Sequence, residues 1–135
     1  MQYFTISELT RSQTAKALHI DNFPTPEAVD NMEVLINECL DHIRELWGKP
    51  IYVTSGYRCP ELNKAVKGKA TSQHLKGEAA DITTGNIDDN KKLFNLIVGN
   101  INGIVYDQLI DESGYQWLHI SYKAERNRMQ ILHLK

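Results

Sequence analysis

The sequence predicts an α+β fold in which N-terminal helices pack on a small, mainly antiparallel sheet. A helical pattern of apolar residues dominates the first third of the chain, as far as Trp47. Short β-branched and aromatic runs cluster in the later part, and no repeat or linker separates the two regions. A chain of 135 residues has the length of one domain with one hydrophobic core. We therefore expect residues 1–135 to form a single domain.

Two helices are predicted before the first strand. Ser7 is a candidate N-cap for a short helix in SELTRSQTAKAL. Pro26 fits the first position of a second, longer helix. Gly48 and Pro50 end this helix just after Trp47. The apolar residues with helical spacing inside it are Val29, Met32, Leu35, Ile36, Cys39, Leu40, Ile43 and Leu46.

The remaining elements are short, and Gly-rich or polar segments separate them. The run IYVTS is typical of a strand, and the exposed loop VKGKATSQ follows a short helix. We expect helices at Pro60–Val66 and Asp88–Val98, and further strands at Ala79–Thr83, Tyr106–Ile110, Trp117–Tyr122 and Met129–Leu134.

Composition excludes several classes of partner. The net charge is -2 and the Lys and Arg residues are scattered among acidic ones, so we expect no nucleic-acid partner. No apolar run approaches the roughly 20 residues that cross a bilayer, so we expect no membrane insertion. The N-terminus has no secretory-signal pattern, which predicts a cytoplasmic protein until some other route releases it. Two cysteines, Cys39 and Cys59, are too few for a disulfide framework, so we expect both to be reduced. We also expect the protein to be a monomer.

Two histidines and one aspartate could form a metal site. Strand alternation places Asp81 and His119 on a face of their strands that points away from the core. Gly77 can turn the chain between His74 and Asp81, so that both side chains approach one point. Two imidazoles and one carboxylate suit a catalytic zinc ion, which keeps a fourth position open for water. The other histidines, His19, His42 and His133, are expected to be ordinary surface or hydrogen-bonded residues.

The segment around these residues resembles a known signature. SQHLKGEAAD matches the SxHxxGxAxD pattern of the M15 metallopeptidases, a family of zinc D-alanyl-D-alanine carboxypeptidases, dipeptidases and phage endolysins. Five fixed positions agree, which chance would produce on the order of once in a few million starting points. VTSGYR and CPELN upstream and WLHIS downstream are also similar to segments of this family. The likeness is greatest to its short single-domain branch.

The resemblance implies a fold, a cofactor and roles for particular residues. The fold would be that of the hedgehog and DD-peptidase group, and one Zn2+ per chain would be held by His74, Asp81 and His119. Arg58 would contact the substrate or the developing oxyanion, and we expect Ser72 and Trp117 to line the substrate site. The substrates would be peptidoglycan stem peptides. Carboxypeptidase and endolysin roles both remain open, and a phage or prophage lysin would act at the cell wall after release from the cytoplasm.

The general base departs from the family pattern. Many M15 enzymes have an acidic residue three positions before the last histidine ligand, where this chain has Gln116, and an amide cannot take a proton from water. The candidates lie in DQLIDE. A three-residue hairpin loop places Asp111 and Asp107 on the face of His119, whereas a four-residue loop places Glu112 and Gln108 there.

The resemblance favours Glu112 over Asp111 as the base. The substitution of Gln116 also leaves a second hypothesis open, in which the protein is a zinc-containing peptidoglycan-binding module with impaired catalysis.

Overall fold

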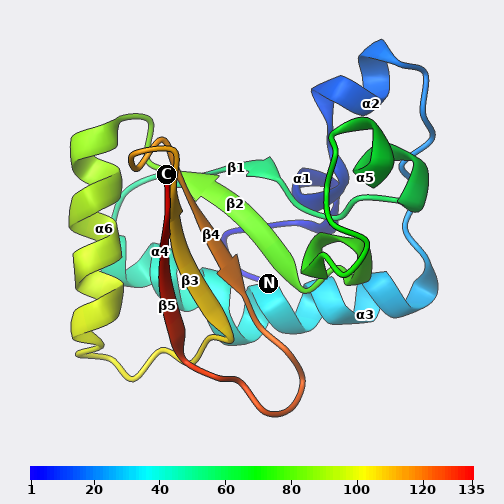
Figure 1. Cartoon of the computed structure of the whole chain (residues 1–135). Coiled ribbons are helices and arrows are strands. Elements are labelled where there is room, and N and C mark those ends of the chain that lie inside the picture. Colours follow the sequence, from blue (N-terminus) through cyan, green and yellow to red (C-terminus); the bar gives the residue numbers. More distant parts are fainter.

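The computed structural model describes all 135 residues and contains one five-stranded sheet (Figure 1). The strands lie in the order β1-β2-β4-β3-β5. Three neighbouring pairs are antiparallel and only β3 and β5 run parallel, so the predicted α+β fold with a mainly antiparallel sheet is confirmed. The strands are β1 (Tyr52–Ser55), β2 (Ala79–Thr83), β3 (Gln108–Glu112), β4 (Trp117–Ser121) and β5 (Gln130–Leu134).

The longest helical element begins at Pro26, as predicted, and ends at Trp47. It comprises α3 (Pro26–Leu35), the π-helical stretch η1 (Ile36–Leu40) and α4 (Asp41–Trp47), with right-handed helical backbone across both junctions. Thr25 caps its start by accepting a hydrogen bond from the Ala28 N–H, and Gly48 ends it in the left-handed region. The other helices are α1 (Ile6–Thr10), α2 (Gln13–Ala17), α5 (Pro60–Ala65), the 3-10 helix η2 (Gln73–Lys76) and α6 (Ile87–Gly99). None of the helices is long and apolar enough to cross a membrane.

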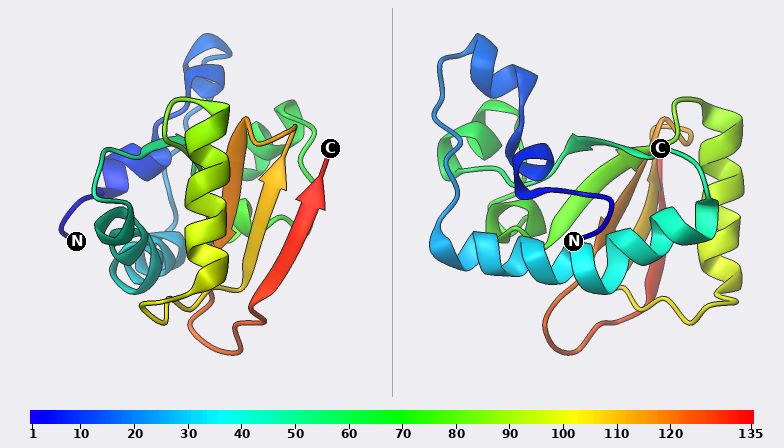
Figure 2. Two further views of the ribbon diagram at one scale, coloured as in Figure 1. Left: turned by 90° about the vertical axis from the view of Figure 1, so that its left-hand side faces the viewer. Right: turned by 180° about the vertical axis from the view of Figure 1, so that it is seen from behind.

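Helices α3, α4 and α6 cover one face of the sheet, as the two views in Figure 2 show. Five strand residues that point toward these helices belong to a single cluster of 24 buried apolar residues. They are Ala80, Ile82, Leu109, Leu118 and Ile120, which alternate with the residues that face the other way. We call the first side the core face and the second the cleft face.

Two predicted elements differ from the structure. The N-terminal segment forms two helices instead of one, because Arg11 is extended, and the caps are Thr5 and Ser12 rather than Ser7. The strand expected at Tyr106–Ile110 begins two residues later. Its first ladder position is displaced because the Asp107 N–H bonds to the Ser121 carbonyl and the Gln108 N–H to the Ser121 hydroxyl.

The cysteine prediction is confirmed. Cys39 and Cys59 are both free and buried, and burial raises the pKa of the Cys39 thiol above its ordinary value. The Cys59 sulfur accepts a hydrogen bond from the Leu62 N–H and so caps α5.

Candidate metal centre

His74 is held in one orientation by the short helix η2. The Ser72 hydroxyl accepts a hydrogen bond from the His74 backbone N–H, and Gly77 ends η2 with φ +74°. A side chain at Gly77 would also meet the Ala28 carbonyl of α3, because a Cβ there would lie 2.5 Å from that oxygen. The glycine therefore permits both the turn and the close approach of η2 to α3.

The tautomer of His74 follows from its hydrogen bond. Its Nδ1 lies 2.7 Å from the Gly56 carbonyl oxygen, which can only accept, so Nδ1 carries the proton. In the neutral ring, Nε2 then has the free lone pair, and it points toward Asp81. A backbone carbonyl on the far ring nitrogen is the usual outer partner of a metal-binding histidine.

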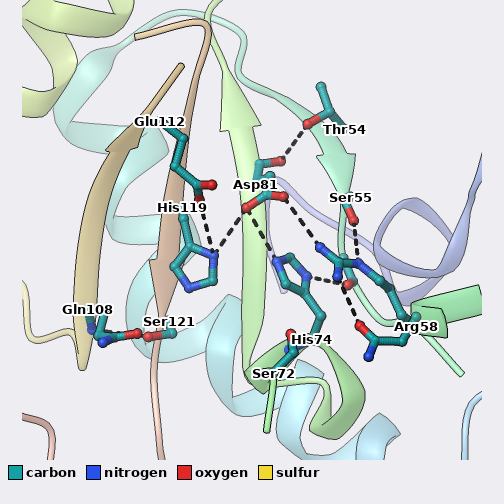
Figure 3. Close-up of polar contacts among 12 residues, drawn as sticks. Thr54, Ser55, Arg58, Ser72, His74, Asp81, Gln108, Glu112, His119 and Ser121 are labelled. Carbon is teal, nitrogen blue, oxygen red and sulfur yellow. Dashed lines mark hydrogen bonds and ion pairs between the residues drawn. The ribbon is translucent and has the colours of Figure 1, made fainter. Parts of the chain in front are cut away.

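Asp81 and His119 face each other across neighbouring strands. They are directly paired in the β2–β4 ladder and lie on the cleft face, as alternation predicted. Asp81 Oδ1 is 3.2 Å from His119 Nδ1 and 3.3 Å from His74 Nε2 (Figure 3). The three donor atoms lie within 4.8 Å of one another, and the three residues are between 3% and 9% exposed.

These residues fit a zinc ion in both spacing and chemistry. Ligand bonds of about 2.0–2.2 Å in a tetrahedron place neighbouring donors about 3.3–3.6 Å apart, close to the two distances from Asp81 Oδ1, 3.3 Å and 3.2 Å. Burial favours the neutral form of Asp81, but hydrogen bonds with His119 and His74 outweigh it and lower the pKa of the carboxyl below its ordinary value. The group therefore offers an ionised carboxylate beside two imidazoles.

Arg58 lies beside this group with its guanidinium fixed on two sides. Nε donates to the Ser55 hydroxyl at 3.3 Å, and one terminal nitrogen donates to Asn63 Oδ1 at 3.0 Å. The other terminal nitrogen is 3.9 Å from Asp81 Oδ2. Burial lowers the pKa of Arg58 below its ordinary value, although the charges of Asp81 and Glu112 oppose this shift. The guanidinium nevertheless stays positively charged at neutral pH. The side chain thus points a fixed positive charge at the cleft.

The hairpin register places Glu112, and not Asp111, on the cleft face. Ile110 pairs with His119 and Glu112 with Trp117, which leaves a four-residue connection between β3 and β4. Glu112 Oε2 is consequently 3.9 Å from His119 Nδ1. Burial and the charge of Asp81 raise the pKa of Glu112 above its ordinary value, while His119 opposes them. A raised carboxyl pKa suits proton transfer near neutral pH.

The alternative base Asp111 is wrong, because its side chain lies on the core face. The Asp111 carboxylate contacts Nδ1 of His133 on that face. Asp107, the other acidic residue that a three-residue loop would have placed beside His119, is buried and is not part of the group of His74, Asp81 and His119. Gln116 is exposed in the hairpin turn, where its backbone N–H bonds to the Glu112 carbonyl. The position that is acidic in many M15 enzymes therefore lies outside the cleft in this chain.

The group lies on the floor of a cleft of about 740 Å³. Trp117 and Ser72 both line it, as expected, and the indole N–H of Trp117 has no hydrogen-bond partner in the protein. Sequence reasoning missed Asn63, which holds Arg58 in place, and four cations of the cleft wall. The only signal for the cations was a scatter of basic residues along the chain: Lys69, Lys76, Lys123 and Arg128.

Two imidazoles and a carboxylate with room for a further ligand are the donor set of a catalytic metal site. The model of the peptidase M15 family matches residues 2–107 of the chain. The protein therefore belongs to the peptidase M15 family and is a metallopeptidase, of a family that is typically zinc-dependent. The match includes Arg58, His74 and Asp81 but ends before Glu112 and His119, which the fold brings to the same point. A search of curated proteins found no match.

Proposed function

We propose that the protein is a zinc-dependent peptidase that hydrolyses peptide bonds in peptidoglycan stem peptides. The observation that carries this proposal is the convergence of His74, Asp81 and His119 on a cleft floor, with a fixed cation on one side and a carboxylate of raised pKa on the other. The peptidoglycan substrate is inferred from membership of the M15 family. Carboxypeptidase and endopeptidase actions are both compatible with an open cleft.

His74 Nε2, His119 Nδ1 and an oxygen of Asp81 would hold the zinc ion. When bound, zinc acts as a Lewis acid toward the scissile carbonyl and lowers the pKa of water toward neutrality. The remaining steps depend on residues of the chain.

Glu112 has the position and the proton affinity of a general base. Its carboxylate oxygen lies 3.9 Å from His119 Nδ1, one of the three proposed metal donors, so a water molecule held beside those donors would be within its reach. It would accept a proton from the attacking water and return it to the leaving amine. Arg58 would donate hydrogen bonds to the carbonyl oxygen as negative charge develops there, and its contacts with Ser55 and Asn63 orient it beforehand.

The test is digestion of purified muropeptides by the zinc-loaded protein, with mass analysis of the products. We expect zinc-dependent release of a defined fragment, which also identifies the cleaved bond, and no release by His119→Ala. The zinc content of both proteins is measured beside the digestion. If the parent protein carries stoichiometric zinc and is still as inactive as His119→Ala, the peptidase proposal is contradicted.

A second candidate function is a zinc-containing peptidoglycan-binding module without catalysis. Gln116 at the usual position of the acidic residue favours it. This candidate predicts that the zinc-loaded protein sediments with peptidoglycan yet releases no product, whereas any zinc-dependent product from the parent protein rejects it.

A further inference from the structure

The two ends of the cleft differ in charge. Along β4, Trp117 pairs with Glu112 at one end. At the other end the Ser121 hydroxyl accepts a hydrogen bond from the Gln108 backbone N–H (Figure 3). Beyond Ser121 the chain continues into the loop of Lys123 and Arg128, and both side chains line the cleft. The far end from Glu112 is therefore the basic end of the cleft.

A buried carboxylate holds this loop in place. Asp107 is fully buried and accepts hydrogen bonds from Arg128 at its backbone N–H (3.0 Å), its Nε (3.0 Å) and a terminal nitrogen (2.7 Å). It also accepts one from Gln73 Nε2 at 2.9 Å, next to His74 in η2. The loop closes on itself through two hydrogen bonds of 2.8 Å between Asn127 and the Lys123 backbone. These hydrogen bonds fix the loop that carries Lys123 and Arg128 as part of the cleft wall.

The anchoring leaves donors available to a ligand. The Arg128 guanidinium engages Asp107 with Nε and one terminal nitrogen only, and half of the Arg128 side chain is exposed. The Lys123 ammonium lies 3.8 Å from Asp107, beyond a direct hydrogen bond, with a third of its side chain exposed. Glu78 on the same wall is the one half-exposed carboxylate nearby: burial above all raises its pKa, while both Lys76 and Lys123 lower it. More cations than carboxylates therefore face the solvent at this end.

We propose that Lys123 and Arg128 form a subsite for a carboxylate of the substrate, removed from the scissile bond. The inference rests on the proposed peptidase function and names a feature of its substrate. Ser121 is two residues from His119, about 7 Å along an antiparallel strand, and Lys123 lies further on. A substrate peptide in extended conformation has the same rise per residue as the strand. The recognised carboxylate therefore belongs to a residue two or three positions from the cleaved bond.

The test compares two stem peptides that contain a glutamyl residue two or three positions from the cleaved bond. In one peptide the carboxylate of this residue is free, and in the other it is amidated. Hydrolysis by the zinc-loaded full chain gives kcat/KM for each, and calorimetry on Glu112→Gln gives affinity without turnover. We expect the free carboxylate to be preferred about tenfold, as a charge-assisted contact predicts, and the preference to fall as salt is added.

Lys123→Gln is the informative variant, and Lys16→Gln, on α2 and outside the cleft, is its matched control. Arg128→Gln is less suitable because it would leave the buried Asp107 carboxylate short of partners. We expect Lys123→Gln to lower the preference to about threefold or less by raising KM for the free-carboxylate peptide. Lys16→Gln should retain the preference of about tenfold and the activity of the parent protein.

Equal hydrolysis and equal binding of the two peptides by the parent protein would overturn the subsite. A preference that survives in Lys123→Gln would also overturn it. If the free carboxylate is bound more tightly and Lys123→Gln removes that difference, but neither peptide is hydrolysed, the peptidase proposal fails and the subsite stands.

Discussion

The two faces of the sheet serve different purposes: residues on the core face stabilise the fold, and residues on the cleft face form the candidate metal centre. On β4, Leu118 and Ile120 are fully buried against the helices, while His119 between them turns its ring to Asp81 and His74. All of these residues are buried, yet only those on the core face belong to the apolar cluster. Burial on the cleft face instead brings polar groups together, which shifts their pKa values and fixes their hydrogen bonds. Neighbouring residues in one strand should therefore fail in different ways when they are replaced.

The largest contrast is expected between His119 and Ile120. His119→Ala removes one of the three proposed zinc donors and is expected to abolish hydrolysis while the fold is retained. Ile120→Ala removes a fully buried core side chain and is expected to cost about 2–5 kcal/mol in the free energy of unfolding, with zinc still bound per folded molecule. Denaturant unfolding and metal content of both variants test the contrast. Similar losses of stability would show that the two faces are not separate in function.

The next contrast is between Glu112 and Asp111, which are adjacent but face opposite ways. Glu112→Gln keeps the shape of the side chain without its basicity, and kcat should fall by about two to four orders of magnitude with zinc retained. Asp111→Asn alters a contact with His133 on the core face and should leave kcat unchanged within about twofold. Steady-state kinetics on the same peptide decide this. A larger kcat effect at Asp111 would contradict the hairpin register.

A smaller effect is expected at Asp107, which precedes β3 and belongs to neither face. The hydrogen bonds from Arg128 lower the pKa of Asp107 to about 2, despite burial. Asp107→Asn should destabilise the protein by about 1.5–3 kcal/mol at neutral pH. Because the folded pKa is depressed, this contribution is complete above the unfolded value of about 3.9 and is lost as pH falls toward about 2.

Unfolding at a series of pH values checks this directly. The stability difference between the parent and Asp107→Asn should shrink between about pH 4 and pH 2. A difference that is constant over this range would mean that the carboxylate does not hold the loop by its charge.

Local periodicity explains why much of the site could be predicted. Alternation within two short strands was enough to place Asp81 and His119 on the side away from the core, and a glycine marked the turn beside His74. The long helix was equally secure, because its apolar spacing and its Pro26 start are local signals. Each of these features depends on residues close together in the chain.

The rest depends on contacts between distant segments. Glu112 and Asp111 could not be separated before the loop length was known, since one residue of register exchanges the two faces. The parallel pairing of β5 with β3 and the anchoring of Arg128 by Asp107 join segments that no local pattern links. The choice of Thr5 over Ser7 as a cap was equally unpredictable, because both hydroxyls precede a helical pattern.

The central claim is that His74, Asp81 and His119 form one zinc site. X-ray absorption on the zinc-loaded protein, combined with metal stoichiometry, tests it most directly. We predict one zinc per chain with two imidazole nitrogens and oxygen donors at about 2.0–2.2 Å, and one imidazole fewer or no bound zinc in His119→Ala. The absence of stoichiometric zinc after reconstitution, or an imidazole count that His119→Ala leaves unchanged, would contradict the claim.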